Sequence, residues 1–158
     1  MRDQLFEIQD ISPKTIVRVG VGVIVRGPCG ILLEKRADCQ KWGLVGGRIE
    51  PGEAIKETAL REVYEETGLQ VDVKALLGVY SEPYCRLLRF EPSGDERHII
   101  DVVVIADVKP GPISLRCSEE STELCWFTLP ATPPECEFLS AAWKPVQDYW
   151  AGASGVLG

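Results

Sequence analysis

The sequence lacks several features that would point to particular classes of protein. Its one histidine, His98, has no serine or cysteine partner in a recognisable nucleophilic triad, so we interpret it as an ordinary strand or loop residue. No apolar run is long enough to cross a bilayer, and the N-terminus has no charged-then-apolar export segment. These absences predict a cytoplasmic protein that does not act on membranes.

Closely spaced cysteine pairs are also missing. The 6 cysteines are Cys29, Cys39, Cys85, Cys117, Cys125 and Cys136. None of them are two or three residues apart, which argues against a zinc knuckle or a redox Cys-x-x-Cys motif. Because no export segment is visible, we interpret the cysteines as reduced rather than as a disulfide framework.

Positive charge is scarce as well. The chain has 17 Lys and Arg against 24 Asp and Glu, a formal net charge of -7. So acidic a surface disfavours nucleic-acid binding, because phosphate contacts need a basic face. An acidic enzyme acting on a small phosphate compound must neutralise that substrate locally, with metal ions or a few arginines. The length of 158 residues fits one domain over 1–158, with a homodimer left open.

Alternating valines give the clearest strand prediction, over residues 15–26. Gly20 and Gly22 interrupt its other face, which indicates that something packs closely there. Residues 31–35 read as the returning strand of a hairpin, and residues 92–95 as an exposed hairpin tip. Further strand-like segments are residues 70–80, 98–108 and 123–128. Strands thus outnumber helices, which favours a mixed sheet with helices packed on it.

Two helices are predicted. The first begins near Glu53 or Ala54 and ends near Glu66 or Thr67, because Gly68 suits the left-handed position after a helix. Its expected buried stripe is Ile55, Ala59, Leu60 and Val63. The second is a terminal amphipathic helix on the spacing of Leu139, Trp143, Val146 and Trp150. Pro145 marks either a kink in it or its first turn.

The first helix carries a cluster of carboxylates. Glu62, Glu65 and Glu66 share one face, since residues three and four apart are neighbours. Without a cation they would repel one another and raise their pKa values. Such oxygen-rich sites suit Mg²⁺, with Mn²⁺ as the alternative. Arg61 lies off that face and could reach back to Glu53. The plainer interpretation is a solvated acidic surface.

The segment from Gly47 to Leu69 resembles the Nudix box of the Nudix hydrolase superfamily, whose members include MutT-like and ADP-ribose pyrophosphatase-like enzymes. The pattern is glycine, five residues, glutamate, seven residues, Arg-Glu, an aliphatic residue, any residue, Glu-Glu, any residue, glycine and an aliphatic residue. Its fixed positions are filled by Gly47, Glu53, Arg61, Glu62, Val63, Glu65, Glu66, Gly68 and Leu69. The lead-in 42–47 departs from many members at Val45, where proline often stands.

The resemblance implies an α/β fold, a Nudix-type α/β/α sandwich with a mixed β-sheet. It implies metal-dependent cleavage of the pyrophosphate bond of a nucleoside diphosphate linked to another group, either ADP-ribose-like or a nucleoside triphosphate. Glu62, Glu65 and Glu66 would bind the metal, with a carbonyl of Gly46 or Gly47. Glu53 would lie behind them or on another metal, and Arg61 would orient the glutamates. Glu120 is the best-placed further acid, with Glu119 and Glu123 as rivals.

Substrate choice lies outside the box. Arg18, Arg36, Arg86 and Arg97 are candidate phosphate contacts, although solvated surface arginines are the default expectation. Trp42, Tyr80, Tyr84 and Phe90 are candidates for stacking on a base, although core packing is the commoner role. An alternative function is a catalytically inactive Nudix-like sensor or scaffold that binds nucleotides. Such domains usually lose box glutamates, and this chain keeps them.

Overall fold

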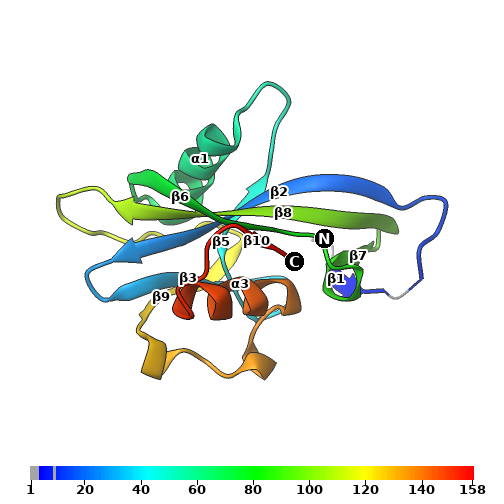
Figure 1. Cartoon of the computed structure of the whole chain (residues 1–158). Helices are drawn as coiled ribbons and strands as arrows, with labels where there is room; N and C mark the ends of the chain where they lie inside the picture. The colour runs from blue at the N-terminus through cyan, green and yellow to red at the C-terminus, as the bar shows by residue number, and fades with distance from the viewer. Residues whose placement is uncertain (1–3, 9) are drawn as a thin grey trace.

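Two long parallel strands form the centre of the fold. In the computed structural model, which describes residues 4–8 and 10–158, β2 (Ile16–Gly27) pairs along its length with β8 (Asp95–Val108). The valines and isoleucines of both strands favour this extended, buried arrangement. Figure 1 shows the pair crossing the middle of the molecule.

The remaining strands extend this pair into a curled, mixed sheet. The path β1-β7-β8-β2-β3-β4 is joined by β5 on β2, β6 on β8, β9 on β3 and β10 on β6. The bounds are β1 (Gln4–Glu7), β3 (Gly30–Arg36), β4 (Trp42–Gly43), β5 (Val45–Arg48), β6 (Val71–Tyr80), β7 (Leu87–Glu91), β9 (Ser121–Phe127) and β10 (Val156–Leu157). Between them lie α2 (Pro83–Arg86) and two short 3-10 helices, η1 (Leu129–Ala131) and η2 (Glu135–Glu137).

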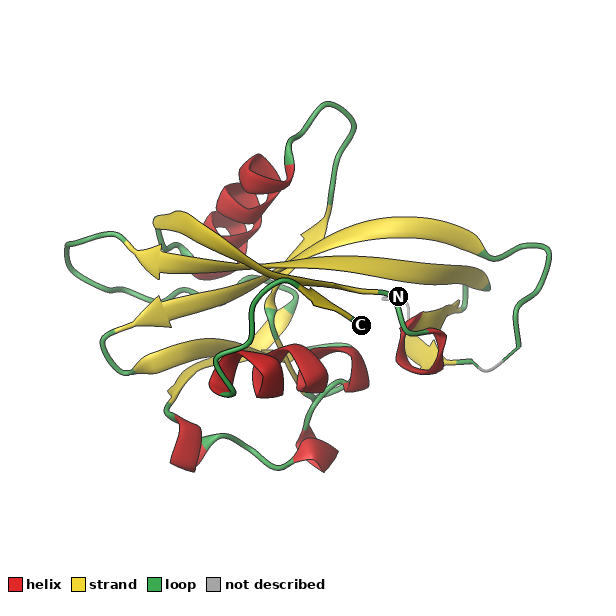
Figure 2. Ribbon diagram, viewed as in Figure 1, coloured by secondary structure: helices red, strands yellow, loops and turns green. Residues whose placement is uncertain are grey.

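One long helix covers each face of the sheet. Helix α1 (Ile55–Thr67) contacts β5, β2 and β6, and α3 (Ser140–Trp150) contacts β6 and β4. Figure 2 shows the two helices on opposite sides of the strands. The predicted α/β/α sandwich with a mixed sheet is therefore confirmed. Every helix in the described residues is too short or too polar to span a bilayer.

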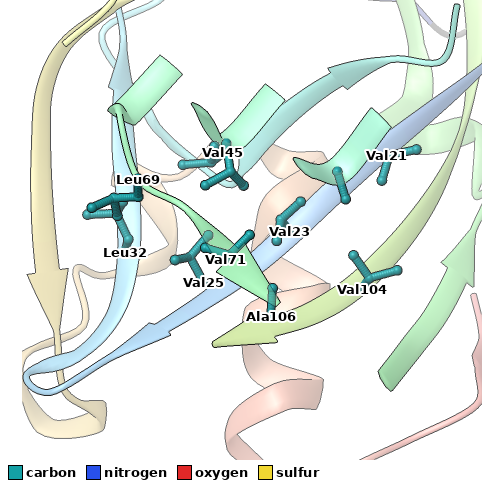
Figure 3. Packing of buried hydrophobic residues seen from close by; sticks show 11 residues of the cluster. Val21, Val23, Val25, Leu32, Val45, Leu69, Val71, Val104 and Ala106 are labelled. Carbon is teal, nitrogen blue, oxygen red and sulfur yellow. The ribbon is translucent and has the colours of Figure 1, made fainter. Parts of the chain in front are cut away.

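Side chains on the two faces of β2 belong to different hydrophobic cores. Val21, Val23 and Val25 point toward α1, where they pack with Ala59 and Val63 (Figure 3). Ile24, from the other face, joins the core under α3. A strand exposes successive side chains on opposite faces, so one sequence element contributes to both layers.

The first helix matches its predicted bounds, but its buried stripe does not. Ala59 and Val63 are fully buried, whereas Ile55 is 37% exposed and Leu60 is only partly buried. Ile55 is the first residue of α1 and lies before the helix crosses the sheet. The C-terminal prediction is confirmed, because Gly68 has φ 76° and its N–H donates to the Tyr64 carbonyl over 2.9 Å.

Pro145 lies inside α3, so of the two alternatives expected for it, a kink or the first turn, the first turn is wrong. The helix begins five residues earlier, at Ser140. Proline has no N–H to donate to the carbonyl four residues before it, which is that of Ala141. The Arg86 Nη2 group donates to this carbonyl instead, over 2.8 Å. A side chain from α2 thus satisfies the acceptor that the proline leaves open.

Sequence patterns missed four short strands and left another undecided. Strands β4, β5, β7 and β10 were not predicted; β7 pairs with β8 and leads into the expected tip at residues 92–95. The N-terminal segment includes the edge strand β1, one of the two states expected for residues 1–14, although residues 1–3 and 9 lie outside the described residues. The close packing expected at Gly20 and Gly22 is present. A Cβ on Gly22 would lie 3.3 Å from Leu44 Cδ1.

Candidate active site

A cavity of about 550 Å³ begins at the end of α1 that carries the glutamates and continues along β2 and β8. Five of the residues predicted for the site line it: Gly46, Arg61, Glu62, Glu65 and Glu120. The other two, Glu53 and Glu66, do not line the cavity and instead contact residues that do. The structure thus brings together the residues that the sequence motif selected.

Arg61 holds the acidic residues of α1 and its preceding turn. Its Nε and Nη2 atoms donate to both oxygens of Glu53, over 2.6 and 2.9 Å. Its Nη1 atom donates to Glu62 over 2.8 Å and to Glu65 over 3.3 Å. The Arg61 hydrogen bonds hold the pKa of Glu53 down at about 2. Arg61 therefore contacts Glu53, which precedes the helix, as well as Glu62 and Glu65 on the helix. Its position in the sequence had suggested the contact with Glu53.

Glu66 points from α1 into the protein rather than into water. It is 4% exposed, and its carboxylate accepts the Gly46 N–H over 2.9 Å. Burial is the main cause that raises its pKa to about 9, and the charge of Glu34 adds to the rise. Burial also raises the pKa of Glu62. The predicted direction of these shifts is confirmed, with burial rather than mutual repulsion as the larger cause.

Two glycines allow β5 to lie close to its neighbours. A Cβ on Gly46 would lie 2.1 Å from the Val21 carbonyl oxygen of β2, and its φ of 149° is unfavourable for other residues. A Cβ on Gly47 would lie 2.4 Å from Glu62 Oε1 of α1. Gly46 therefore permits close pairing with β2, and Gly47 permits the Glu62 carboxylate to lie against the β5 backbone.

Sequence reasoning missed a further acid, Glu34, on β3. It is fully buried, and neither of its oxygens has a hydrogen-bond partner among the described residues. The nearest cation is Arg36, whose Nη1 lies 3.8 Å away and whose hydrogen bonds go to Asp38. Burial raises the pKa of Glu34 to about 7 despite Arg36. The sequence signal that could have identified Glu34 is its position directly after the apolar run Ile31–Leu33.

The donor set fits a hard divalent cation. A buried carboxylate without partners is costly and calls for an explanation such as an ion or water. Glu34 raises the pKa of the buried Glu66, and both are influenced by Glu62 and Glu120. All these donors are carboxylate oxygens, the ligands that Mg²⁺ and Mn²⁺ prefer. Yet in residues 4–8 and 10–158 no group of three or more acidic, histidine or cysteine side chains is arranged to hold a metal ion. Arg61 instead binds Glu62 and Glu65, and the Gly46 N–H binds Glu66.

Of the three acids considered in and before β9, which are Glu119, Glu120 and Glu123, Glu120 is the one that lines the cavity. It is exposed, and its backbone carbonyl accepts the Ala37 N–H over 2.8 Å, which fixes the loop against the segment after β3. Glu123 is exposed on β9, opposite Lys35 of β3. Among the acids weighed, Glu120 is thus best placed to act beside Glu62.

The candidate substrate contacts divide between cavity and core. The four arginines singled out from the sequence all line the cavity: Arg18, Arg36, Arg86 and Arg97. Among the aromatic residues, Phe90 lines it, Trp42 and Tyr80 are buried in the core under α3, and Tyr84 is 72% exposed outside the cavity. His98 contacts the Ser81 carbonyl through Nε2 over 2.7 Å.

Comparisons with known proteins agree with this geometry. Over 118 residues the chain is 39% identical to an ADP-ribose pyrophosphatase of Methanocaldococcus jannaschii, covering 73% of this chain and 64% of that protein. Over 103 residues it is 36% identical to a MutT-like protein of Streptomyces ambofaciens, covering 62% and 67%. A NUDIX hydrolase structure from Nitrosomonas europaea shares the fold, with TM-score 0.70, 23% identity and coverage of 89% and 76%. A NUDIX domain model matches residues 17–150, and the chain therefore belongs to the NUDIX domain family.

Proposed function

We propose that this protein is a metal-dependent pyrophosphohydrolase. Its substrate would be a nucleoside diphosphate linked to another group, ADP-ribose-like or a nucleoside triphosphate. The observation that carries the proposal is the cavity that has Glu62, Glu65 and Glu120 at one end and continues along β2 and β8. A relative that spans much of this chain is named an ADP-ribose pyrophosphatase, which supports the same class of reaction.

The carboxylates of Glu62, Glu65 and Glu66, together with the Gly46 carbonyl, would hold Mg²⁺ or Mn²⁺. Bound Mg²⁺ neutralises phosphate charge and lowers the pKa of a coordinated water. Arg61 keeps Glu62 and Glu65 oriented through the contacts of its Nη1 atom. Arg18 and Arg97, which line the cavity, supply positive charge for the rest of an anionic substrate. This local charge compensates for the overall acidity of the chain.

Glu120 is the proposed proton acceptor. It lines the cavity beside Glu62, and its carboxylate is exposed, so it can reach a water or substrate. Such a base takes the proton of the attacking water as the pyrophosphate bond breaks. The remaining catalytic contribution comes from positioning and from charge neutralisation, because phosphoryl transfer needs little covalent help from the protein.

We expect Glu120→Gln to lower kcat more than it raises KM, because a base acts mainly in the transition state. A loss of roughly 100-fold in kcat lies within the usual contribution of one acid or base. Steady-state kinetics on a nucleotide panel would measure this. Glu123→Gln is the matched control, since Glu123 is exposed in the adjacent strand and does not line the cavity. Equal kcat in the two variants would assign the base to the box helix itself.

Metal removal gives a second test. We expect exhaustive chelation to abolish formation of the nucleoside monophosphate product and the return of Mg²⁺ or Mn²⁺ to restore it. We also expect either cation to raise the melting temperature of the chelated protein, because it binds the folded state and relieves buried negative charge. Full turnover after chelation would overturn the proposed mechanism. Nucleotide binding without turnover of any panel member would instead indicate a sensor or scaffold.

A further inference from the structure

At the far end of the cavity, one carboxylate lies over the backbone of the neighbouring strand. Asp101 of β8 is paired with Gly20 of β2 in the sheet register. A Cβ built on Gly20 would lie 2.6 Å from Asp101 Oδ1. Because Gly20 has no side chain, the Asp101 carboxylate can occupy this position. Both residues line the cavity.

The buried guanidinium group of Arg86 binds the Asp101 carboxylate. Its side chain is 1% exposed, and its Nε donates to Asp101 Oδ2 over 3.2 Å. Its other nitrogens donate to Glu82 Oε2 and to the Ala141 carbonyl, each over 2.8 Å. Because Arg86 is bound on three sides, it holds Asp101 in one orientation.

One oxygen of Asp101 stays available to a ligand. Oδ2 accepts from Arg86, whereas Oδ1 receives no hydrogen bond from the described residues. The side chain is 25% exposed and lines the cavity, so Oδ1 is not sealed in the core. A carboxylate paired with a guanidinium is an acceptor only. What it can select is therefore a hydrogen-bond donor on the ligand.

The distance from the acidic end of the cavity suits the length of a nucleoside. Gly20 pairs with Asp101 on one side and with Arg48 of β5 on the other. Adjacent strands lie about 4.8 Å apart, so Asp101 is roughly 10 Å across the sheet from the residue that follows Gly47. A phosphate held at the acidic end would therefore place its nucleoside toward Asp101.

The walls around Asp101 favour a flat ring over a sugar. Leu88, Ile99 and Val103 also line the cavity. Ile99 and Val103 flank Asp101 on the same face of β8, because they lie two residues to either side of it. A ribose carries hydroxyl groups around its edge, whereas a nucleobase has apolar faces and polar groups at its rim. A base could bury its faces here and present its rim to the carboxylate.

We propose that Asp101, positioned by Arg86 over Gly20, selects nucleobases that carry an exocyclic amino group. This inference rests on the proposed function for the identity of the ligand as a nucleotide. Asp101 would accept a hydrogen bond from the amino group, and a base without that donor would leave Oδ1 desolvated and unpaired. Asp101 is thus a specificity-determining residue, and Arg86 is its positioning residue.

Binding of nucleoside monophosphates tests the proposal without requiring turnover. Calorimetric titrations with Mg²⁺ present would compare GMP with IMP, which lacks the 2-amino group. They would also compare AMP with purine riboside monophosphate, which lacks the 6-amino group. We expect the amino-bearing ligand to bind at least about tenfold more tightly in one of the two pairs, in line with one well-placed base contact. Equal affinities within both pairs, or no binding of any of the four, would overturn the assignment.

Asp101→Asn sharpens the test. Its amide oxygen can still accept from Arg86, but its NH₂ group would then face the cavity and donate instead of accepting. We expect the affinity ratio to fall below about threefold, while Asp107→Asn, on the same strand but outside the cavity, keeps it. An unchanged ratio in Asp101→Asn would overturn the proposal. Should that variant misfold, the wild-type ratios still decide it.

The two proposals can fail separately. Hydrolysis of the matching triphosphates and of ADP-ribose by the wild-type protein tests the proposed activity. If none is cleaved but the monophosphate ratios hold, Asp101 selects the base in a binding protein. If substrates are cleaved but the ratios are equal, the activity stands and the role of Asp101 is wrong.

Discussion

Glu66→Gln is expected to lower kcat/KM by roughly 100-fold or more, comparable to the loss of one preorganised charge. Glu66 is buried against β5, and its carboxylate accepts the Gly46 N–H. Glutamine keeps the size of the side chain and an oxygen for that bond but removes the charge that would bind the metal. The measurement is steady-state hydrolysis at saturating Mg²⁺, repeated for Glu65→Gln.

The same variant should keep its fold, because glutamine preserves the size of the side chain and the bond from the Gly46 N–H, and the raised pKa already leaves Glu66 largely uncharged near neutral pH without metal. We therefore expect the melting temperature of the metal-free variant to equal or exceed that of the wild type. Glu57→Gln is the control on the same helix. Glu57 is exposed, accepts the Ala54 N–H as a capping residue and lies outside the cavity, and glutamine can still cap. Wild-type turnover in both Glu65→Gln and Glu66→Gln would show that the acidic face takes no part in catalysis.

Arg86→Leu should produce the largest loss of stability. The variant leaves the carboxylates of Asp101 and Glu82 without their cationic partner and the Ala141 carbonyl without its hydrogen-bond donor. Removing one partner of a buried ion pair typically costs about 3–5 kcal/mol of unfolding free energy. We expect Arg86→Leu to lower the free energy of unfolding by about 3 kcal/mol, because Asp101 and Glu82 keep some contact with water. Denaturant unfolding would measure it.

Two variants calibrate that result. Arg86→Lys keeps the charge but cannot span three partners, so an intermediate loss is expected. Arg26→Leu removes an ion pair with Asp107 in which both side chains are about 40% exposed. Its expected loss is below about 1 kcal/mol. If Arg86→Leu and Arg26→Leu unfold at the same denaturant concentration, the Arg86 contacts do not stabilise the fold.

Local pattern was sufficient wherever the physical cause is local. The valine alternation predicts β2 because successive side chains of a strand face opposite sides. The C-terminal end of α1 follows from Gly68, which adopts the left-handed conformation that ends a helix. The glutamates of α1 share a face because of helical periodicity alone. For the same reason, the Nudix box selected Glu62 and Glu65 before any tertiary contact was known, and the structure places both in the lining of one cavity.

Periodicity was less reliable at the ends of elements and for residues that depend on distant partners. Ile55 fits the apolar spacing of α1, yet it lies at the first turn, beyond the sheet that buries Ala59 and Val63. Pro145 was expected to mark either a kink in α3 or its first turn, and it lies in the interior of the helix. It is accommodated because Arg86, more than fifty residues earlier in the sequence, donates to the Ala141 carbonyl.

The sequence alone determined the layered fold, the family resemblance and the set of acids on one helix face, since each depends on spacing along the chain. Tertiary structure decided which further acids join them. Glu34 reads locally as the end of an apolar strand, and only the packing of β3 leaves its carboxylate buried without a partner. Asp101 reads as an ordinary polar residue in a strand. The pairing of β8 with β2 sets it over Gly20, and only the folded chain brings Arg86 behind it.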